Sequence, residues 1–167
     1  MNNLINVKYL SLIIMISILL VACGQSPESH FRVTLISNGS EVRIEEYVGR
    51  DVRVGIPRRI QNLPVTEIGY GAFFNKGLVA VRLPKDLKTI GEAAFLRNNL
   101  TVIRFPKSVR YIGNYAFGDS RSATSFSHGK EKLTIGCKSF YWSTLSMLRD
   151  WDSIVFTCDP CRERRCN

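Results

Sequence analysis

The sequence predicts a solenoid of stacked, β-rich coils with short helical turns, preceded by a β-hairpin cap and followed by an irregular C-terminal cap. Two observations lead to this prediction. The pattern IGxxAF, which reads IGEAAF at residues 90–95, recurs with its isoleucine at positions 68, 90 and 112, and a looser copy, IGCKSF, begins at position 135. An apolar segment ending in proline precedes each of the first three copies. Self-similarity at a fixed spacing of about 22 residues is typical of folds built from stacked units.

Each coil is expected to contain two inward-facing segments. In VRLP (residues 81–84) and IRFP (residues 103–106), the residues one and three before the proline are apolar and point to the same side of a strand. The proline ends the strand because it has no N–H for the ladder. In the IGxxAF phrase, the glycine is expected to allow a tight turn, and the phenylalanine to stack on that of the next coil. A single coil cannot bury these groups by itself, so they must be buried by stacking against neighbouring coils.

The repeats are flanked by two predicted caps. Residues 31–51 form the N-terminal cap, since residues 31–48 alternate apolar and polar around an Asn-Gly turn signal and read as a β-hairpin. Residues 52–140 hold three to four repeats of 22–23 residues. The fourth copy is weak, because SATSFSHGKEK stands where its upstream strand is due. Residues 141–167 form the C-terminal cap, with a short amphipathic helix and a last strand over 153–157.

The N-terminus is predicted to be a lipoprotein leader. Residues 1–22 contain a 13-residue, largely apolar run that is shorter than the roughly 20 residues of a membrane-spanning helix. The run ends in LVAC, residues 20–23, which resembles the lipobox of bacterial lipoproteins. The resemblance implies that Cys23 carries fatty acyl groups such as palmitate and anchors the chain, with residues 23–30 as a tether. An ordinary signal peptide or a buried core helix is the alternative.

Export would place the other cysteines in an oxidising compartment. Cys137, Cys158, Cys161 and Cys166 are therefore candidates for structural disulfides, with three pairings open. A four-cysteine zinc site fits the spacing loosely. A redox motif at Cys158 and Cys161 is less favoured, because a thioredoxin-type fold needs further strands after it.

Longer phrases carry a family resemblance. LTVIRFPKSVRYIGNYAF (residues 100–117) and LVAVRLPKDLKTIGEAAF (residues 78–95) resemble the BspA-like leucine-rich repeats of bacterial cell-surface proteins. Residues 41–73 resemble the lead-in of such arrays. The resemblance implies a right-handed leucine-rich-repeat solenoid that serves as a binding surface, often in adhesion to host proteins or other cells, and it supplies no catalytic residues.

The repeat register also aligns basic residues. The chain has 23 Lys and Arg against 14 Asp and Glu, a net charge of +9. Counted from each proline, basic side chains recur two residues before it, one after it and four after it. These seven candidates are Arg58, Arg82, Lys85, Lys88, Arg104, Lys107 and Arg110. Like charges stacked in a column repel each other, so their alignment argues against an accident. It favours a surface that binds an acidic protein, an anionic polysaccharide or anionic lipid heads near the anchor. The alternative is a solvated basic face that only aids solubility.

These features together predict a non-enzymatic binding or adhesion protein of the cell envelope, lipid-anchored at the outer membrane or cell surface. Its partner would be an acidic protein, host extracellular matrix included, or an anionic polysaccharide. Nucleic acid is disfavoured, because exposed aromatics are not interleaved with the basic residues. No metal or cofactor is expected, and His30 and His128 lie too far apart in sequence to suggest a hydrolytic triad. A structural periplasmic lipoprotein without an external ligand is the alternative, and self-association through an end coil stays open.

Overall fold

A computed structural model describes residues 24–120, 123–126, 132–140 and 154–157 of the chain. The predicted signal peptide and Cys23 lie outside these residues. The strands are β1 (Phe31–Ile36), β2 (Glu41–Tyr47), β3 (Arg53–Gly55), β4 (Arg59–Ile60), β5 (Leu63–Ile68), β6 (Ala80–Arg82), β7 (Thr89–Ile90), β8 (Val102–Phe105), β9 (Tyr111–Ile112), β10 (Ala123–Phe126), β11 (Leu133–Ile135) and β12 (Ile154–Phe156). Within the described residues, the one helical segment is the 3₁₀ turn η1 (Glu28–His30), and no helix is long and apolar enough to cross a membrane.

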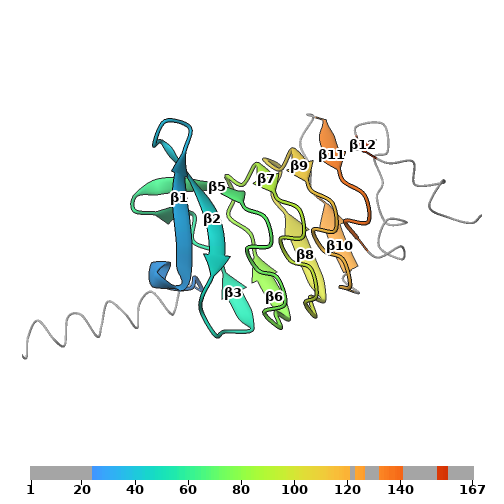
Figure 1. Cartoon of the computed structure of the whole chain (residues 1–167), viewed down its shortest axis with the longest axis horizontal. Helices are drawn as coiled ribbons and strands as arrows, with labels where there is room; N and C mark the ends of the chain where they lie inside the picture. Colours follow the sequence, from blue (N-terminus) through green and yellow to red (C-terminus); the bar gives the residue numbers. More distant parts are fainter. Residues whose placement is uncertain (1–23, 121–122, 127–131, 141–153, 158–167) are drawn as a thin grey trace, which may run out of the picture.

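The strands stack into a solenoid with two sides (Figure 1). One side is an eight-stranded sheet in the order β1-β2-β5-β7-β9-β11-β12, with β4 against β5. In it, the repeated residues Ile68, Ile90, Ile112 and Ile135 pair in parallel register from coil to coil. On the other side, β3 pairs with β6 and β8 with β10, also in parallel. Each of four successive coils therefore contributes one strand to each side, and the repeat predicts this for the first three.

The interior is organised around a column of aromatic rings. Phe73, Phe95, Phe117 and Phe140 are buried, and successive ring centroids lie 4.8, 5.0 and 5.2 Å apart. Their planes differ by 14°, 8° and 6°, so the rings lie almost parallel. Aromatic pairs at such separations add to the free energy of burial. The predicted stacking of phenylalanines is confirmed.

The N-terminal hairpin adds one residue to the isoleucine row and one ring to the aromatic column. Ile44 of β2 pairs with Ile68, which places it in the isoleucine row. The Tyr47 N–H donates to the Ala72 carbonyl (2.8 Å), and the Tyr47 ring stacks on Phe73 with centroids 5.4 Å apart. The hairpin is thus a cap that supplies the wall that the first coil would otherwise lack.

Two hairpin turns use left-handed backbone. Between the antiparallel strands β1 and β2, Asn38 and Gly39 have φ of 56° and 82°, which confirms the hairpin expected there. Between β4 and β5, Gln61 and Asn62 have φ of 52° and 63°, as in type I′ hairpin turns. In the first coil, five more residues separate Pro57 from Ile68 than separate the equivalent residues of later coils, and this second hairpin contains them.

The glycine of the repeated phrase has a different role from the expected one. Gly113 and Gly136 do not have positive φ; the left-handed position of the coil comes later, for example at Ala93 with φ of 53°. A Cβ on Gly113 would lie 2.5 Å from the backbone N of Glu92, and a Cβ on Gly136 would lie 2.5 Å from that of Asn114. Glycine is therefore needed here for the close approach of neighbouring coils.

A buried amide ties the central coils together. The Asn98 side chain donates to the carbonyls of Phe73 and Phe95 (2.8 Å each) and accepts from the Leu78 N–H (2.9 Å). Ser120 Oγ donates to the Asn98 carbonyl at 3.0 Å. Asn98 is only 2% exposed, so these bonds satisfy groups that water cannot reach.

The C-terminal part of the solenoid contains one strand more than expected. β10 occupies the SATSFSHGKEK stretch and pairs in register with β8, even though the proline-terminated pattern is absent there. Backbone hydrogen bonds to the edge of β8 suffice, because an open strand edge offers unpaired groups to any extended segment. β12 confirms the last predicted strand. The helix expected in the C-terminal cap falls on residues 141–153, which lie outside the described residues.

Residues 24–30, expected to form a tether, instead pack against the fold. The Ser26 N–H donates to the Gly55 carbonyl (2.7 Å), and the Ser26 hydroxyl accepts from the Gly55 N–H (3.3 Å). A Glu28 carboxylate oxygen accepts from the Gln61 N–H at 3.0 Å. Because β3 is the edge strand of its sheet, its unpaired backbone groups bind this segment.

Candidate functional site

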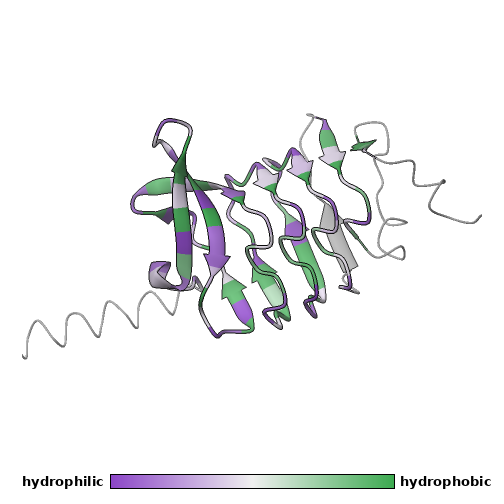
Figure 2. Cartoon of the chain, in the orientation of Figure 1, coloured by the Kyte–Doolittle hydropathy of each residue, from purple (hydrophilic) through white to green (hydrophobic). Residues whose placement is uncertain are grey.

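An open groove of ≈ 680 Å³ runs over the outer face of β3, β6 and β8. Among the described residues, four basic side chains line it and no acidic side chain does. The basic residues are Arg53, Arg82, Lys85 and Arg104. Each of the three strands β3, β6 and β8 contains both hydrophobic and hydrophilic residues, which Figure 2 shows as green and purple segments in β3 and β8.

Strand alternation positions these side chains. In β8, Ile103 and Phe105 are buried, so the intervening Arg104 and the preceding Val102 point outward. In β6 the same alternation exposes Arg82. The groove therefore combines guanidinium groups with exposed apolar surface, including Val102, which is 48% exposed.

The start of the described chain forms one wall of the groove. Gly24 lines it, and a Cβ at this position would lie 2.9 Å from both terminal nitrogens of Arg82. On the other side, the Gly24 carbonyl oxygen lies 2.0 Å from where a Cβ of Gly55 would be. Only glycine at position 55 lets the leading segment lie this close to β3.

Three of the lining charges form no close ion pair among the described residues, although Lys85 acts electrostatically on Asp86 and helps to lower the pKa of that carboxyl group. Arg53, Lys85 and Arg104 are exposed and form no ion pair with another described residue. Arg53 was not among the candidates from the sequence. It directly precedes the inward-facing Val54, and strand alternation at this position could have indicated that Arg53 points outward. A hollow lined by one sign of charge focuses the electrostatic potential and concentrates anions.

Comparison with known proteins identifies the repeat. The profile of the BspA type leucine rich repeat region matches residues 59–156 in six copies, which is more than half of the chain. The chain belongs to this family. Among solved structures, a leucine-rich repeat protein of T. pallidum is similar, with 23% identity, a TM-score of 0.47 and coverage of 68% of this chain and 72% of that chain. No curated protein matches significantly.

Proteins with leucine-rich repeats are generally protein-binding scaffolds, and the repeat family is usually non-catalytic. In this BspA-type protein, the other four predicted basic residues lie outside the groove. Two of them, Arg58 and Lys88, form ion pairs with carboxylates. Arg58 Nε donates to Asp86 Oδ2 at 2.6 Å. This charged hydrogen bond holds the pKa of Asp86 below its usual value. Arg58 therefore adds little net positive charge to the surface.

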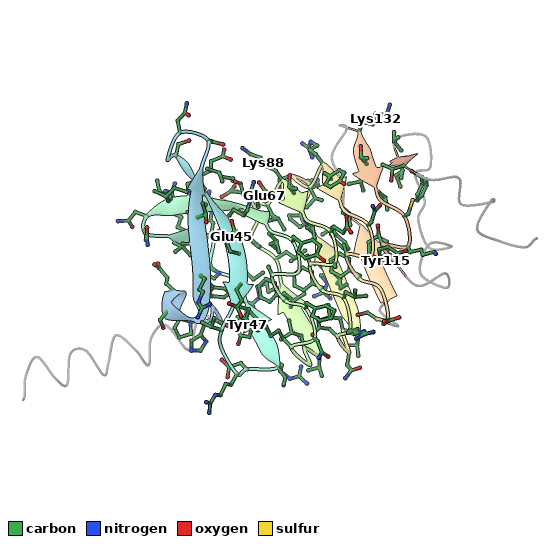
Figure 3. All side chains as sticks on the ribbon, viewed as in Figure 1. Glu45, Tyr47, Glu67, Lys88, Tyr115 and Lys132 are labelled. Carbon is green, nitrogen blue, oxygen red and sulfur yellow. The ribbon has the colours of Figure 1, made fainter. Side chains whose placement is uncertain are left out.

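Lys88 is compensated in the same way. Its ammonium pairs with the carboxylate of Glu41, which also accepts from the Thr66 hydroxyl (2.8 Å). The hydrogen bond from Lys88, followed by that from Thr66, lowers the pKa of Glu41. Lys88 directly precedes β7, so it lies on the side of the long sheet, and Figure 3 shows it near Glu67.

Arg110 and Lys107 complete the predicted set. The Arg110 N–H donates to the Lys88 carbonyl (2.8 Å), so these two positions are neighbours in adjacent coils, as predicted. Arg110 Nη1 donates to the Lys107 carbonyl at 2.5 Å. Ser108 Oγ donates to the Lys85 carbonyl at 2.8 Å, which holds the loops bearing Lys85 and Lys107 together. Lys107 is exposed but does not line the groove.

Of the four candidate disulfide cysteines, Cys137 is described, and Cys158, Cys161 and Cys166 lie outside the described residues. The Thr157 N–H donates to the Ile135 carbonyl (3.0 Å), and Thr157 Oγ1 lies 4.0 Å from Cys137 Sγ. The β11–β12 register pairs Ile135 with Phe156. Cys158 directly follows Thr157 in the sequence, so of the three other cysteines it is the one bonded to a residue in contact with Cys137.

We therefore expect Cys137 to pair with Cys158. A peptide map of the non-reduced protein should contain this cross-link, and Cys137→Ser should lower the free energy of unfolding by about 3 kcal/mol. Cys161→Ser is the matched control and should cost less. A cross-link from Cys137 to Cys161 or Cys166 would contradict the expected pairing.

Proposed function

We propose that this BspA-type repeat protein is a non-enzymatic binding protein of the cell envelope, and that its basic groove takes an acidic partner. The observation that supports the proposal is that the described part of the chain lines the groove with four basic side chains and no acidic one. The ligand groups would be carboxylates or sulfates, as in an acidic protein segment or an anionic polysaccharide.

The geometry of the groove suits an extended anionic ligand. Arg82 and Arg104 occupy equivalent positions in adjacent coils, which are roughly 4.8 Å apart in a stacked array. Guanidinium groups bind carboxylate or sulfate oxygens with two parallel hydrogen bonds, which gives directional recognition. The exposed Val102 would contact apolar parts of the ligand.

The location of the protein is also part of the proposal. LVAC at residues 20–23 follows an apolar run, the pattern of an acylated lipoprotein. An anchor on Cys23 would hold the solenoid at the outer membrane or cell surface. Because repeat scaffolds of this kind generally bind other molecules, we expect the protein to act there by binding and not by catalysis.

Charge reversal in the groove tests the proposal. Lys85→Glu with Arg104→Glu should weaken binding to heparin or polyglutamate by about 30-fold, because four units of charge change at about 0.5 kcal/mol each. The salt dependence of the affinity should also become flatter. Isothermal titration at several salt concentrations measures both effects.

The matched control is Arg97→Glu with Lys132→Glu, which makes the same change in net charge outside the groove. Circular dichroism verifies that both variants are folded. Groove and control variants with equal affinities would refute the groove as the binding site, whatever the affinity of the parent chain.

A further inference from the structure

The chain enters the fold at the groove. Gly24 lies against Arg82 and lines the groove, and the hydrogen bonds between Ser26 and Gly55 hold the leading segment in place. Gly24 is the first described residue, and Cys23 directly precedes it in the sequence, so an acyl group on Cys23 would be attached one residue before the rim of the groove.

The binding of residues 24–30 to the fold would shorten the distance between the solenoid and a membrane that holds its N-terminus. A free tether over residues 24–30 would let the solenoid move up to about 25 Å from its anchor in any orientation. With residues 24–30 bound to β3 and to the turn at Gln61, that freedom is lost. The side of the solenoid that carries β3, β6 and β8 would therefore be the side nearest to an anchor on Cys23.

The charges on that side match a phosphate-rich surface. Arg53, Lys85 and Arg104 are exposed without an ion pair among the described residues. Arginine binds phosphate oxygens in bidentate fashion, and each basic residue close to an anionic leaflet strengthens membrane binding. A basic patch would add electrostatic attraction to the attachment that the acyl groups supply, and it would orient the solenoid on the membrane surface.

We propose that the groove lies against the membrane that holds the anchor and binds the phosphate groups of anionic phospholipids. This inference rests on the part of the proposed function that gives the groove an anionic ligand, and it assigns lipid phosphate as that ligand in place of an acidic protein or a polysaccharide. The opposite side of the solenoid, with Thr89, Tyr111 and Thr134 in register along the long sheet, would then face away from the bilayer.

Vesicle binding tests the inference. The full chain with Cys23→Ser, which cannot be acylated at that position, is sedimented with phosphatidylcholine vesicles with or without one third phosphatidylglycerol. The anionic lipid should increase the partition coefficient, and added salt should reverse the increase. Arg53→Gln, Lys85→Gln and Arg104→Gln together should reduce binding to the anionic vesicles on the order of 100-fold.

The charge-matched control is Arg32→Gln with Arg97→Gln and Lys132→Gln, which are outside the groove. This control should lose no more than about threefold, because distant exposed charges are screened. Residues 1–22 are identical in all variants, so their contribution cancels in the comparison.

Orientation provides a second measurement. Acylated chains with Val102→Trp or Tyr111→Trp are reconstituted in brominated phosphatidylglycerol vesicles, with the parent chain as background. The tryptophan at position 102 should be quenched strongly and that at position 111 weakly. Equal quenching, or vesicle binding that the groove variant retains, would overturn the inference.

The two proposals fail in different ways. If heparin and polyglutamate bind through the groove but anionic vesicles do not, the groove has a polymeric ligand and the lipid inference is wrong. If neither polymer nor vesicle binding depends on Lys85 and Arg104, both proposals are wrong.

Discussion

Replacing Phe95 by alanine is expected to lower the free energy of unfolding by about 4 kcal/mol, a large share of the 5–15 kcal/mol typical of a domain. Phe95 is fully buried between the rings of Phe73 and Phe117, at 4.8 and 5.0 Å. Both neighbours are fixed by the ladder, so the coils cannot close the cavity left by the missing ring.

Urea unfolding followed by circular dichroism measures this loss. Phe74→Ala is a matched control one coil earlier, because Phe74 is 40% exposed and its main described contact is with the Arg97 guanidinium, 5.8 Å from the ring centroid. The control should cost less than about 1 kcal/mol. Similar losses in the two variants would mean that the aromatic column is not the main source of stability.

Replacing Gly113 by alanine is expected to cost about 3 kcal/mol or more, although it adds only one methyl group. The new Cβ would lie 2.5 Å from the Glu92 nitrogen and 2.7 Å from the Gly91 carbonyl carbon. These are backbone atoms, so relief requires moving two coils apart and weakening the bond from the Gly113 N–H to the Ile90 carbonyl (2.8 Å).

Glu92→Ala is the matched control, since Glu92 is exposed and next in sequence to the glycine of its own coil. It should change the unfolding free energy by less than about 0.5 kcal/mol. Amide exchange at Gly113 gives a local measurement, and the alanine variant should exchange faster there. Unchanged exchange and stability would show that the coils can spread at little cost.

The repeat itself was predictable because each coil makes the same contacts as the next. The spacing of Ile68, Ile90 and Ile112 implied a stacked row, and the structure pairs them in register. The phenylalanine column followed from the same spacing. The fourth strand, β10, was not predicted, since its pairing with β8 depends on backbone groups more than on a side-chain pattern.

The candidate site was predictable only in part. Repeat spacing put Arg82, Lys85 and Arg104 on one side of the solenoid, and these three line the groove. It could not reveal that Asp86 neutralises Arg58 and that Glu41 neutralises Lys88, because these partners are 28 and 47 residues away in sequence.

The sequence by itself determined the solenoid, its register and the excess of positive charge, because these depend on periodic local patterns. The tertiary structure alone decided which charges remain unpaired and where residues 24–30 lie, because both depend on contacts between segments far apart in the chain. Gly24 shows the difference most clearly. It reads as part of a polar linker, but the free edge of β3 and the absence of a side chain on Gly55 bring it into the groove.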